Sequence, residues 1–286
     1  MSVQITTAFV EQYKANVLHL AQQKGSRLRD AVRTETVTGK AHFFERIGST
    51  SAQKRTSRHS DTPRMDTPHS RRKVSMDDYD WADLIDNEDK VRLLISPQSE
   101  YAMAGAWAMG RAMDDAIIAA ATGTAYSGVA GGTSVTLPSG QKVAHGGAGL
   151  SVTKLLNAKE LLDAADVDPD EPRFVVCAAG QIADLLAITE ITSSDYNTVR
   201  ALAAGQIDTY LGFKFITSQR LGTDSTPSRQ CLAFTKSAIG LALGVDISTK
   251  ISERADKNYA TQVFLSMTIG ATRIEEEKMV EIAANE

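Results

Sequence analysis

The sequence predicts an α+β fold, and three observations indicate it. A stretch rich in Ala and Gly, 97–122, follows Ser96, a capping residue with proline at the first helical position after it. Apolar residues alternate with polar ones in 245–251 and again in 259–269, as in half-buried strands. Between the start of the chain and the helix lies 48–73, a segment too polar to build a core of its own.

Length and composition narrow the class of protein. With 286 residues, 42% of them hydrophobic, the chain is long enough for two cores or one elongated core. A net charge of −4 and a pI near 5.8 argue against a dedicated nucleic-acid binder. Cys177 and Cys231 show neither a disulfide framework nor a zinc spacing, so we expect reduced core thiols. No signal peptide or apolar run of spanning length is visible, which predicts a soluble protein that does not engage a membrane.

The first 47 residues predict one helix and some extended chain. Thr6 or Thr7 can cap a helix with an apolar stripe that ends before Gly25. Residues 34–47 then read as short extended structure.

The segment 48–73 holds two apolar side chains, Ala52 and Met65, and a net charge of +5. It buries too little surface to offset the entropy of ordering it. Two interpretations stay open: an arm that becomes ordered on a partner, or a disordered linker. Its basic side chains, together with one just before the segment, are candidate contacts with other copies of the chain: Arg46, Lys54, Arg55, Arg58, Arg64, Arg71, Arg72 and Lys73.

An acidic stretch follows directly. Residues 77–89 carry seven acids and no Lys or Arg, and Asp77, Asp78 and Asp80 are the first of them. Neighbouring blocks of opposite charge suit head-to-tail contacts between identical subunits, in which the basic arm of one copy meets the acidic patch of another.

The helix over 97–122 is dominated by small residues. Small side chains let another backbone approach closely, so we expect close packing at Gly105 and Gly110, with Trp107 filling a gap. The chain after the helix is mixed. We expect a small hairpin over 135–144, helices at 152–162, 181–188, 197–204 and 236–243, and strands at 173–178, 210–217, 231–234, 245–251, 259–269 and 279–282.

The sequence contains none of the common motifs for phosphate binding, zinc binding or a serine nucleophile. The Gly-rich region after the helix lacks both phosphate-binding fingerprints, the five histidines have no H-E-x-x-H spacing, and no G-x-S-x-G elbow exists. Asp114 and Asp115 are adjacent on a helix and point about 100° apart, so we interpret them as a solvent-facing helix end. We therefore predict no catalytic residues, no metal site and no cofactor.

Several blocks resemble tailed-bacteriophage major capsid proteins of the Hong Kong 97 fold, in the form common among podophage-like coats. The resemblance covers approximately residues 5–282, and its most specific pieces are 195–197 and 211–213. The blocks that carry it are SEYAMAGAWAMGRAMDDAIIAAATGTA, PRFVVCAAGQIADLL, SSDYNTVRALAAGQIDTYLGFKFITSQRL, AFTKSAIGLALGVDISTKISERADKNYA and GATRIEEEKMVEI.

The resemblance implies a division of the chain into parts with different roles in a shell. An N-terminal arm would occupy 1–35 and an extended loop 36–80, reaching over an adjacent subunit. A peripheral domain would comprise 81–150, with the long spine helix 97–122, and the closing strands 245–286. An axial domain, 151–244, would meet its copies around the five- and six-fold axes.

The resemblance also implies function and partners. The chain would be a virion protein, not an enzyme, that assembles in the host bacterial cytoplasm into pentamers and hexamers of an icosahedral shell around double-stranded DNA, which it contacts non-specifically. Fewer than 40 residues precede the extended loop, so a separate scaffolding protein is expected. A portal is also expected, and a decoration protein is possible. The lysine–asparagine cross-link of some relatives does not align here. Two alternatives stay open: an encapsulin-type compartment shell, and a soluble enzyme with a disordered insert.

Overall fold

The structure is a computed structural model that describes residues 21–59, 61–62, 64–86, 98–188, 209–224 and 228–286. It divides into two compact units. The first comprises 1–26, 78–113 and 245–268, and the second comprises 27–77, 114–244 and 269–286. The predicted helices near residue 6 and at 197–204, and the motif 195–197, lie outside the described residues.

The described chain alternates strands with three α-helices and two short 3₁₀ segments. In chain order the elements are η2 (Arg29–Ala31), β1 (Arg33–Thr36), β2 (Ala41–Ile47), β3 (His69–Ser75), β4 (Asp77–Ile85), α2 (Gln98–Thr122), β5 (Ala125–Ser127), β6 (Thr133–Val135), η3 (Ser139–Gln141), β7 (Lys142–Val143), α3 (Val152–Ala164), β8 (Arg173–Cys177), α4 (Ala179–Ala187), β9 (Thr209–Tyr210), β10 (Phe213–Thr217), β11 (Ser228–Thr235), β12 (Ile239–Arg254), β13 (Ala260–Arg273) and β14 (Met279–Asn285).

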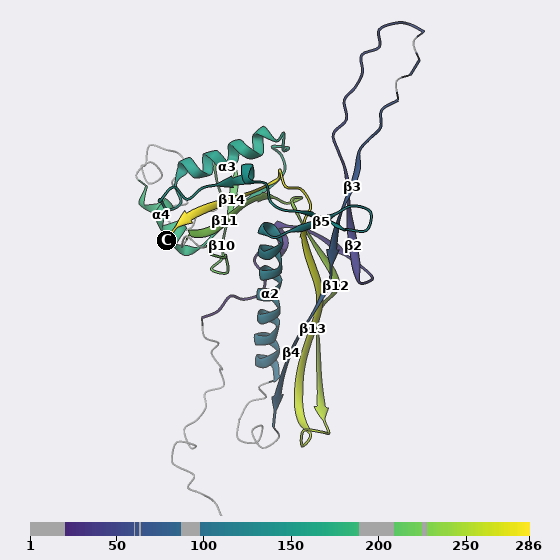
Figure 1. Cartoon of the computed structure of the whole chain (residues 1–286). Helices are drawn as coiled ribbons and strands as arrows, with labels where there is room; N and C mark the ends of the chain where they lie inside the picture. Colours follow the sequence, from purple (N-terminus) through teal and green to yellow (C-terminus); the bar gives the residue numbers. More distant parts are fainter. Residues whose placement is uncertain (1–20, 60, 63, 87–97, 189–208, 225–227) are drawn as a thin grey trace, which may run out of the picture. The chain divides into compact units, whose positions relative to one another are not determined.

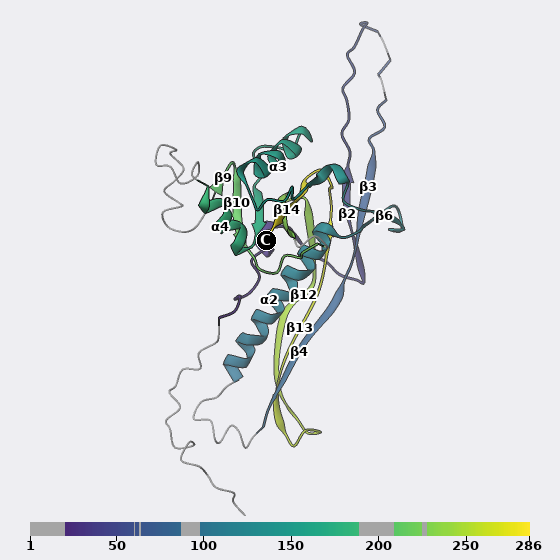
Figure 2. The ribbon, with the colours of Figure 1, turned by 60° about the vertical axis from the view of Figure 1, so that its left-hand side comes forward.

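The first unit packs the long helix on a sheet. Strands β12, β13 and β4 are neighbours in a sheet of order β1-β12-β13-β4, and the first half of α2 runs along β4 and β13 (Figure 2). A Cβ added to Gly105 would come within 2.6 Å of the Trp81 ring and 2.7 Å of Leu265. The helix thus lies on this sheet by means of its small residues, and its bounds agree with the prediction for 97–122.

The second unit is built on a six-stranded sheet of order β7-β14-β11-β8-β10-β9. Strand β8 is buried along its whole length, parallel to β10 on one side and antiparallel to β11 on the other. Helix α3 packs on this sheet at β14 (Figure 1). Ser151 caps α3 by accepting a hydrogen bond from the Lys154 backbone N–H at 3.4 Å.

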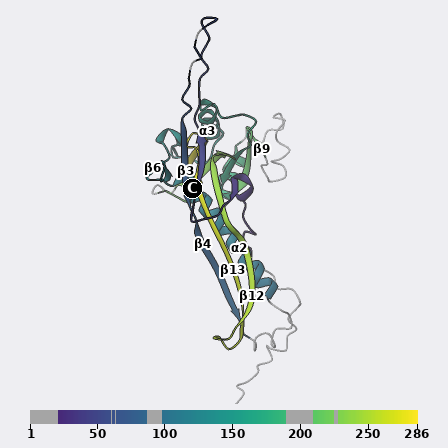
Figure 3. The ribbon, with the colours of Figure 1, turned by 90° about the vertical axis from the view of Figure 1, so that its right-hand side faces the viewer.

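The same unit holds a long hairpin formed by β2 and β3. The two strands pair from Ala41↔Ser75 to Ile47↔His69, and β3 continues the sheet to β5 and β6 (Figure 3). Phe44 and Val74 lie in a buried cluster with Ile274. A Cβ added to Gly240 would come within 2.6 Å of the Phe44 ring, so glycine is required where this ring meets β12.

Three expectations were wrong. Residues 236–243 are not a helix, because β12 begins at Ile239 and pairs in parallel with β1. No hairpin spans 135–144, since β6 pairs with β5 and β7 pairs with β14. Residues 69–73, the last of the polar segment 48–73, do form regular structure, because they belong to β3.

Among the described helices, none combines the length and apolarity that crossing a bilayer requires.

Candidate functional site

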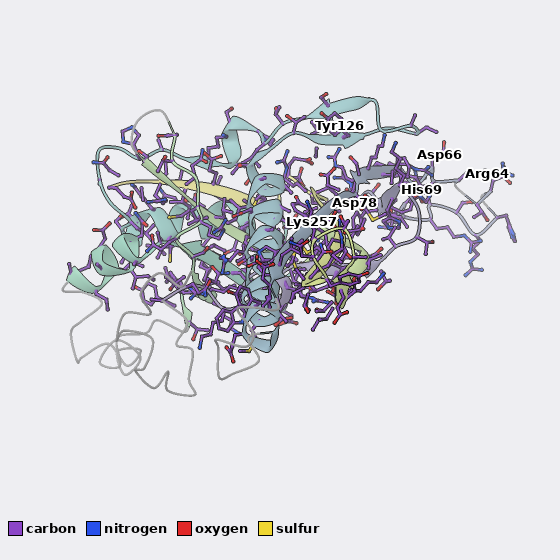
Figure 4. The ribbon with its side chains drawn as sticks, turned by 90° about the horizontal axis from the view of Figure 1, so that it is seen from below. Arg64, Asp66, His69, Asp78, Tyr126 and Lys257 are labelled. Atoms are coloured by element: carbon purple, nitrogen blue, oxygen red, sulfur yellow. The ribbon has the colours of Figure 1, made fainter. Side chains whose placement is uncertain are left out.

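The loop between β2 and β3, residues 48–68, is the most exposed part of the second unit. Every described residue from Ile47 to His69 is exposed, and the loop closes where the Gly48 N–H donates to the Pro68 carbonyl at 2.8 Å. Figure 4 shows Arg64 and Asp66 on this loop beyond the strand end at His69. The described residues of the loop are therefore not covered by other parts of the second unit.

The loop is basic. The loop carries four basic residues and only two acids. The basic residues are Lys54, Arg55, Arg58 and Arg64, and the acids are Asp61 and Asp66. Within the described part of the chain, none of these four cations has an ion-pair partner, and Arg55 Nε donates to the Ser57 carbonyl at 2.8 Å. Their charge is available to a partner outside the unit.

The base of the hairpin is held very differently. Arg72 is 4% exposed, and its Nη2 donates to both carboxylate oxygens of Glu276, at 2.6 and 2.7 Å. Its Nε donates to the Ile274 carbonyl at 3.2 Å. A bidentate pair of this kind fixes direction as well as distance, so Arg72 anchors strand β3 to the loop before β14.

Two further arginines surround the same carboxylate. Arg46 Nη1 lies 3.5 Å from Glu276 Oε2 and also donates to the Ile274 carbonyl, and the Arg273 Nε lies 3.8 Å from Oε1. Arg273 is fully buried, and its other nitrogens donate to the carbonyls of Ala121, Gly123 and Val135. Burial lowers the pKa of Arg273, and the nearby Glu276 opposes that change. We call Arg46, Arg72, Arg273 and Glu276 the arginine anchor.

This geometry gives three of the candidate contact residues partners within their own subunit. Arg46 and Arg72 belong to the arginine anchor inside their own subunit. Arg71 pairs across the hairpin with Glu45 at 3.1 Å. The structure places the remaining cation of this strand, Lys73, beside Gly131, where an added Cβ would come within 2.3 Å of Lys73 Cδ.

The predicted acidic partners lie on strand β4. Asp77, Asp78 and Asp80 are exposed, and Asp78 Oδ1 accepts a hydrogen bond from Thr268 Oγ1 at 2.7 Å. Their outward side chains alternate with half-buried Tyr79 and Trp81.

Close packing in the first unit involves the three predicted residues in different ways. A Cβ added to Gly110 would come within 2.5 Å of the Gly25 and Ser26 backbones, so a second backbone crosses the helix there. At Gly105 the close neighbours are side chains and not backbone. Trp107 is half-buried under the Lys24 ammonium group, whose Nζ lies 5.4 Å from the ring centroid.

The interpretation of Asp114 as solvent-facing was wrong. Asp114 is fully buried, and its carboxylate accepts hydrogen bonds from the backbone N–H groups of Arg27, at 3.1 and 3.2 Å, and Leu28, at 3.1 Å. Asp115 pairs with Arg220. No local pattern signals this role, because the donors lie some 86 residues away in sequence.

The described residues hold no arrangement suited to catalysis. None of their histidines, cysteines and acids gather in threes that could hold a metal ion. A groove of about 480 Å³ in the second unit lies beside the hairpin base and is lined by residues such as Arg46, Ser70, Asp166 and Glu277. These are surface charges without a nucleophile and base in contact.

Comparison with known proteins gives one consistent result. A family model described as "Phage capsid protein" matches residues 5–286. Nothing among curated proteins matches the chain.

Solved phage capsids have the same fold at low sequence identity. The capsid structure of cyanophage P-SCSP1u has a TM-score of 0.74 and 19% identity, covering 100% of this chain and 96% of that one. The asymmetric unit of the cyanophage Pam1 capsid gives 0.68 and 14%, covering 99% of each chain. A structure of Mycobacterium phage Che8 gives 0.67 and 17%, covering 95% of this chain and 96% of that one.

The Hong Kong 97-type α+β fold predicted from the sequence is thereby confirmed. The basic loop and the arginine anchor fit a protein whose work is contact with other proteins. The chain belongs to the phage capsid protein family, so it is a structural component of a virion and not an enzyme.

Proposed function

We propose that this chain is the major capsid protein of a tailed phage, assembling into pentamers and hexamers of an icosahedral shell that encloses double-stranded DNA. Membership of the capsid family supports a shell role. The observation that carries the proposal is the contrast within one hairpin: an exposed basic loop on a base fixed by buried ion pairs. A rigid base delivers the loop to a defined place on a neighbour.

The proposed parts keep the roles that the resemblance implies. Residues 81–150 and 245–286 form the peripheral domain, and 151–244 form the axial domain around the five- and six-fold axes. The hairpin within 36–80 is the extended loop, and 1–35 is the N-terminal arm.

The loop cations meet acids of an adjacent subunit. Lys54, Arg55, Arg58 and Arg64 supply the positive charge, and the exposed Asp77, Asp78 and Asp80 are the leading candidates on the neighbour. Each exposed pair contributes only about 0–1 kcal/mol. The contact recurs at every position in a shell, so a small local gain becomes a large one for the particle.

Assembly takes place in the host bacterial cytoplasm with a separate scaffolding protein and a portal, and a decoration protein can be added later. The packaged DNA is contacted non-specifically. The lumenal surface is neutral to acidic, because a lining that held phosphates tightly would resist packaging.

The test is production of the full-length chain with its scaffolding protein, followed by electron microscopy and size-exclusion chromatography. Closed shells of megadalton size support the proposal, and a small uniform oligomer with no shells contradicts it. Nuclease-protected DNA in particles from phage-producing cells supports a genome container, whereas protein cargo without DNA supports a compartment shell instead.

A matched pair of variants tests the loop. Replacing Lys54, Arg55, Arg58 and Arg64 with Gln should abolish shells while leaving circular dichroism and thermal unfolding unchanged. The control removes the same charge from exposed lysines elsewhere, at Lys40, Lys214, Lys236 and Lys250, and should assemble normally. If both variants assemble equally well, the loop charges do not drive assembly.

A further inference from the structure

The two cysteines of the chain lie on neighbouring strands of the six-stranded sheet. Strands β8 and β11 pair antiparallel from Thr235↔Arg173 to Leu232↔Val176. Continuing this register by one residue sets Cys231 opposite Cys177. Side chains of opposite residues in an antiparallel pair lie on the same face of the sheet. Two thiols 54 positions apart in sequence are therefore placed side by side.

Backbone hydrogen bonds identify which kind of pair this is. Opposite residues alternate between hydrogen-bonded and non-hydrogen-bonded pairs along an antiparallel ladder. The Lys236 N–H donates to the Pro172 carbonyl at 3.2 Å, which marks Lys236 and Pro172 as a hydrogen-bonded pair. Counting five positions along the ladder makes Cys231 and Cys177 a non-hydrogen-bonded pair.

The other neighbours of both strands agree with this assignment. The Cys177 carbonyl accepts from the Ser218 N–H at 2.9 Å, on the side of β8 away from β11. The Thr235 N–H donates to the Lys278 carbonyl at 3.2 Å, and the same alternation makes Cys231 and Ile282 a hydrogen-bonded pair on β14. The backbone polar groups of both cysteines thus point away from each other.

That geometry suits a covalent link. In non-hydrogen-bonded pairs the opposite Cα atoms are about 4.5 Å apart, closer than in the other kind of pair. A disulfide needs a Cα separation of about 4.4–6.8 Å. The backbone therefore needs no large movement to accept a bond between the two sulfur atoms.

The surroundings disfavour the thiolate form of both cysteines. Both cysteines are 0% exposed, and burial raises the pKa of both thiols, that of Cys231 to about 12. The backbone N–H of Ala178 and the Lys154 ammonium group oppose this change at Cys231. Lys154 is itself fixed there, because its Nζ donates to the carbonyls of His145, Ala148 and Ala283 at 2.7, 2.7 and 3.0 Å. The Ala178 N–H and the Lys154 ammonium group thus favour the thiolate form of Cys231.

We propose that Cys177 and Cys231 form an oxidation site that closes to a cross-strand disulfide between β8 and β11 when the protein meets a small peroxide. The Cys231 thiolate attacks one peroxide oxygen, breaking the O–O bond and forming a sulfenic acid with release of water after proton uptake. The Cys177 sulfur then attacks the Cys231 sulfur, and the sulfenic hydroxyl leaves with the Cys177 proton as a second water. Two thiols and one hydrogen peroxide give one disulfide and two waters, so two electrons pass from sulfur to peroxide.

The bond would join the two central strands of the sheet and close the chain from 178 to 230, which includes α4 and β10. Closing a loop of this length restricts the unfolded chain and raises Tm by roughly 10 °C. The site would make the subunit more stable outside a reducing cytoplasm than within it.

The test uses the full-length reduced protein treated with hydrogen peroxide. Remaining thiols are alkylated after unfolding, and peptides are mapped by mass spectrometry under non-reducing conditions. The expected result is one linked pair of peptides containing Cys177 and Cys231, with loss of two hydrogen atoms, and a Tm increase that a thiol reductant reverses. Two alkylatable thiols, a sulfinic acid, or a bridge between chains would each overturn the proposal.

Two variants control for other effects of the oxidant. Cys177→Ala and Cys231→Ala should show no peroxide-dependent increase in Tm, because neither can close the bond. An equal increase in Tm in either variant would show that the disulfide is not its cause. If a variant fails to fold, peptide mapping of the unaltered protein still decides between a linked pair and separate thiols.

Discussion

The base of the β2–β3 hairpin and its loop carry the same type of side chain in opposite environments. At the base, the Arg72 side chain is 5% exposed and shares both oxygens of Glu276. In the loop, Arg58 and Arg64 are exposed and have no ion-pair partner within the described residues. Arginine at the base serves the fold of one subunit, whereas arginine in the loop has a use only if a second molecule provides the acid. The charge of a segment therefore says less about its role than the burial of each charge.

The difference predicts a large loss of stability at the base. Replacing Arg72 with Ala removes the bidentate ion-pair partner of the Glu276 carboxylate, which is largely shielded from solvent. Breaking a buried pair of this kind costs about 3–5 kcal/mol. Urea unfolding of the purified subunit measures this. Arg71→Ala is the control, because Arg71 lies on the same strand in a partly exposed pair with Glu45 that contributes about 0–1 kcal/mol. Equal losses in both variants would remove the distinction between base and loop.

One consequence concerns charge reversal over the whole strand. Changing Arg71, Arg72 and Lys73 together to Glu would place a carboxylate against Glu276 and unfold the base. Assembly experiments should therefore alter the loop and leave β3 intact.

A second effect, of intermediate size, contrasts a tightly packed glycine with a glycine that has open space around it. Gly110→Leu would drive a side chain into the Gly25 and Ser26 backbones and should cost about 1–3 kcal/mol or more and block assembly. Gly132→Leu is the control, since an added Cβ there meets nothing within 4 Å. Thermal unfolding and particle yield are the measurements. Normal yields of particles from Gly110→Leu would show that this crossing is dispensable.

The smallest effect per contact is that of salt on the loop. Raising the ionic strength from 0.1 M to 1 M shortens the Debye length from about 10 Å to about 3 Å. Exposed pairs between subunits should weaken, so light scattering should report slower assembly. The Tm of the free subunit should change little, because the arginine anchor is buried. Assembly rates that do not depend on salt would argue for an apolar contact at the loop.

Elements with strong local patterns could be predicted from the sequence. The long helix was expected over 97–122 and observed over Gln98–Thr122, and β8, α3 and β13 lie close to their expected positions. The small apolar residues after 236 suit either a helix or a strand, so the local pattern does not distinguish the two. Pairing with β1, some 200 residues earlier, decides in favour of a strand.

The arginine anchor could be predicted only in part. Alternation along β3 puts Arg72 on the same face as Val74, which is a sign that Arg72 and not Arg71 points inward. Its partner Glu276 lies 204 residues away, and nothing in the sequence selects it from the run of three glutamates. Buried ion pairs between distant segments depend on the tertiary fold, so the sequence alone cannot specify them.

Hydrogen exchange tests the central contrast most directly. The amide groups of the loop, 49–67, and of β3, 69–75, should be measured in free subunits and in assembled shells. We predict that β3 is protected in both states, because its hydrogen bonds and the arginine anchor lie within one subunit. The loop should exchange fast in the free subunit and become protected in the shell, because only a neighbour can cover it. Equal exchange of the loop in both states would contradict the account.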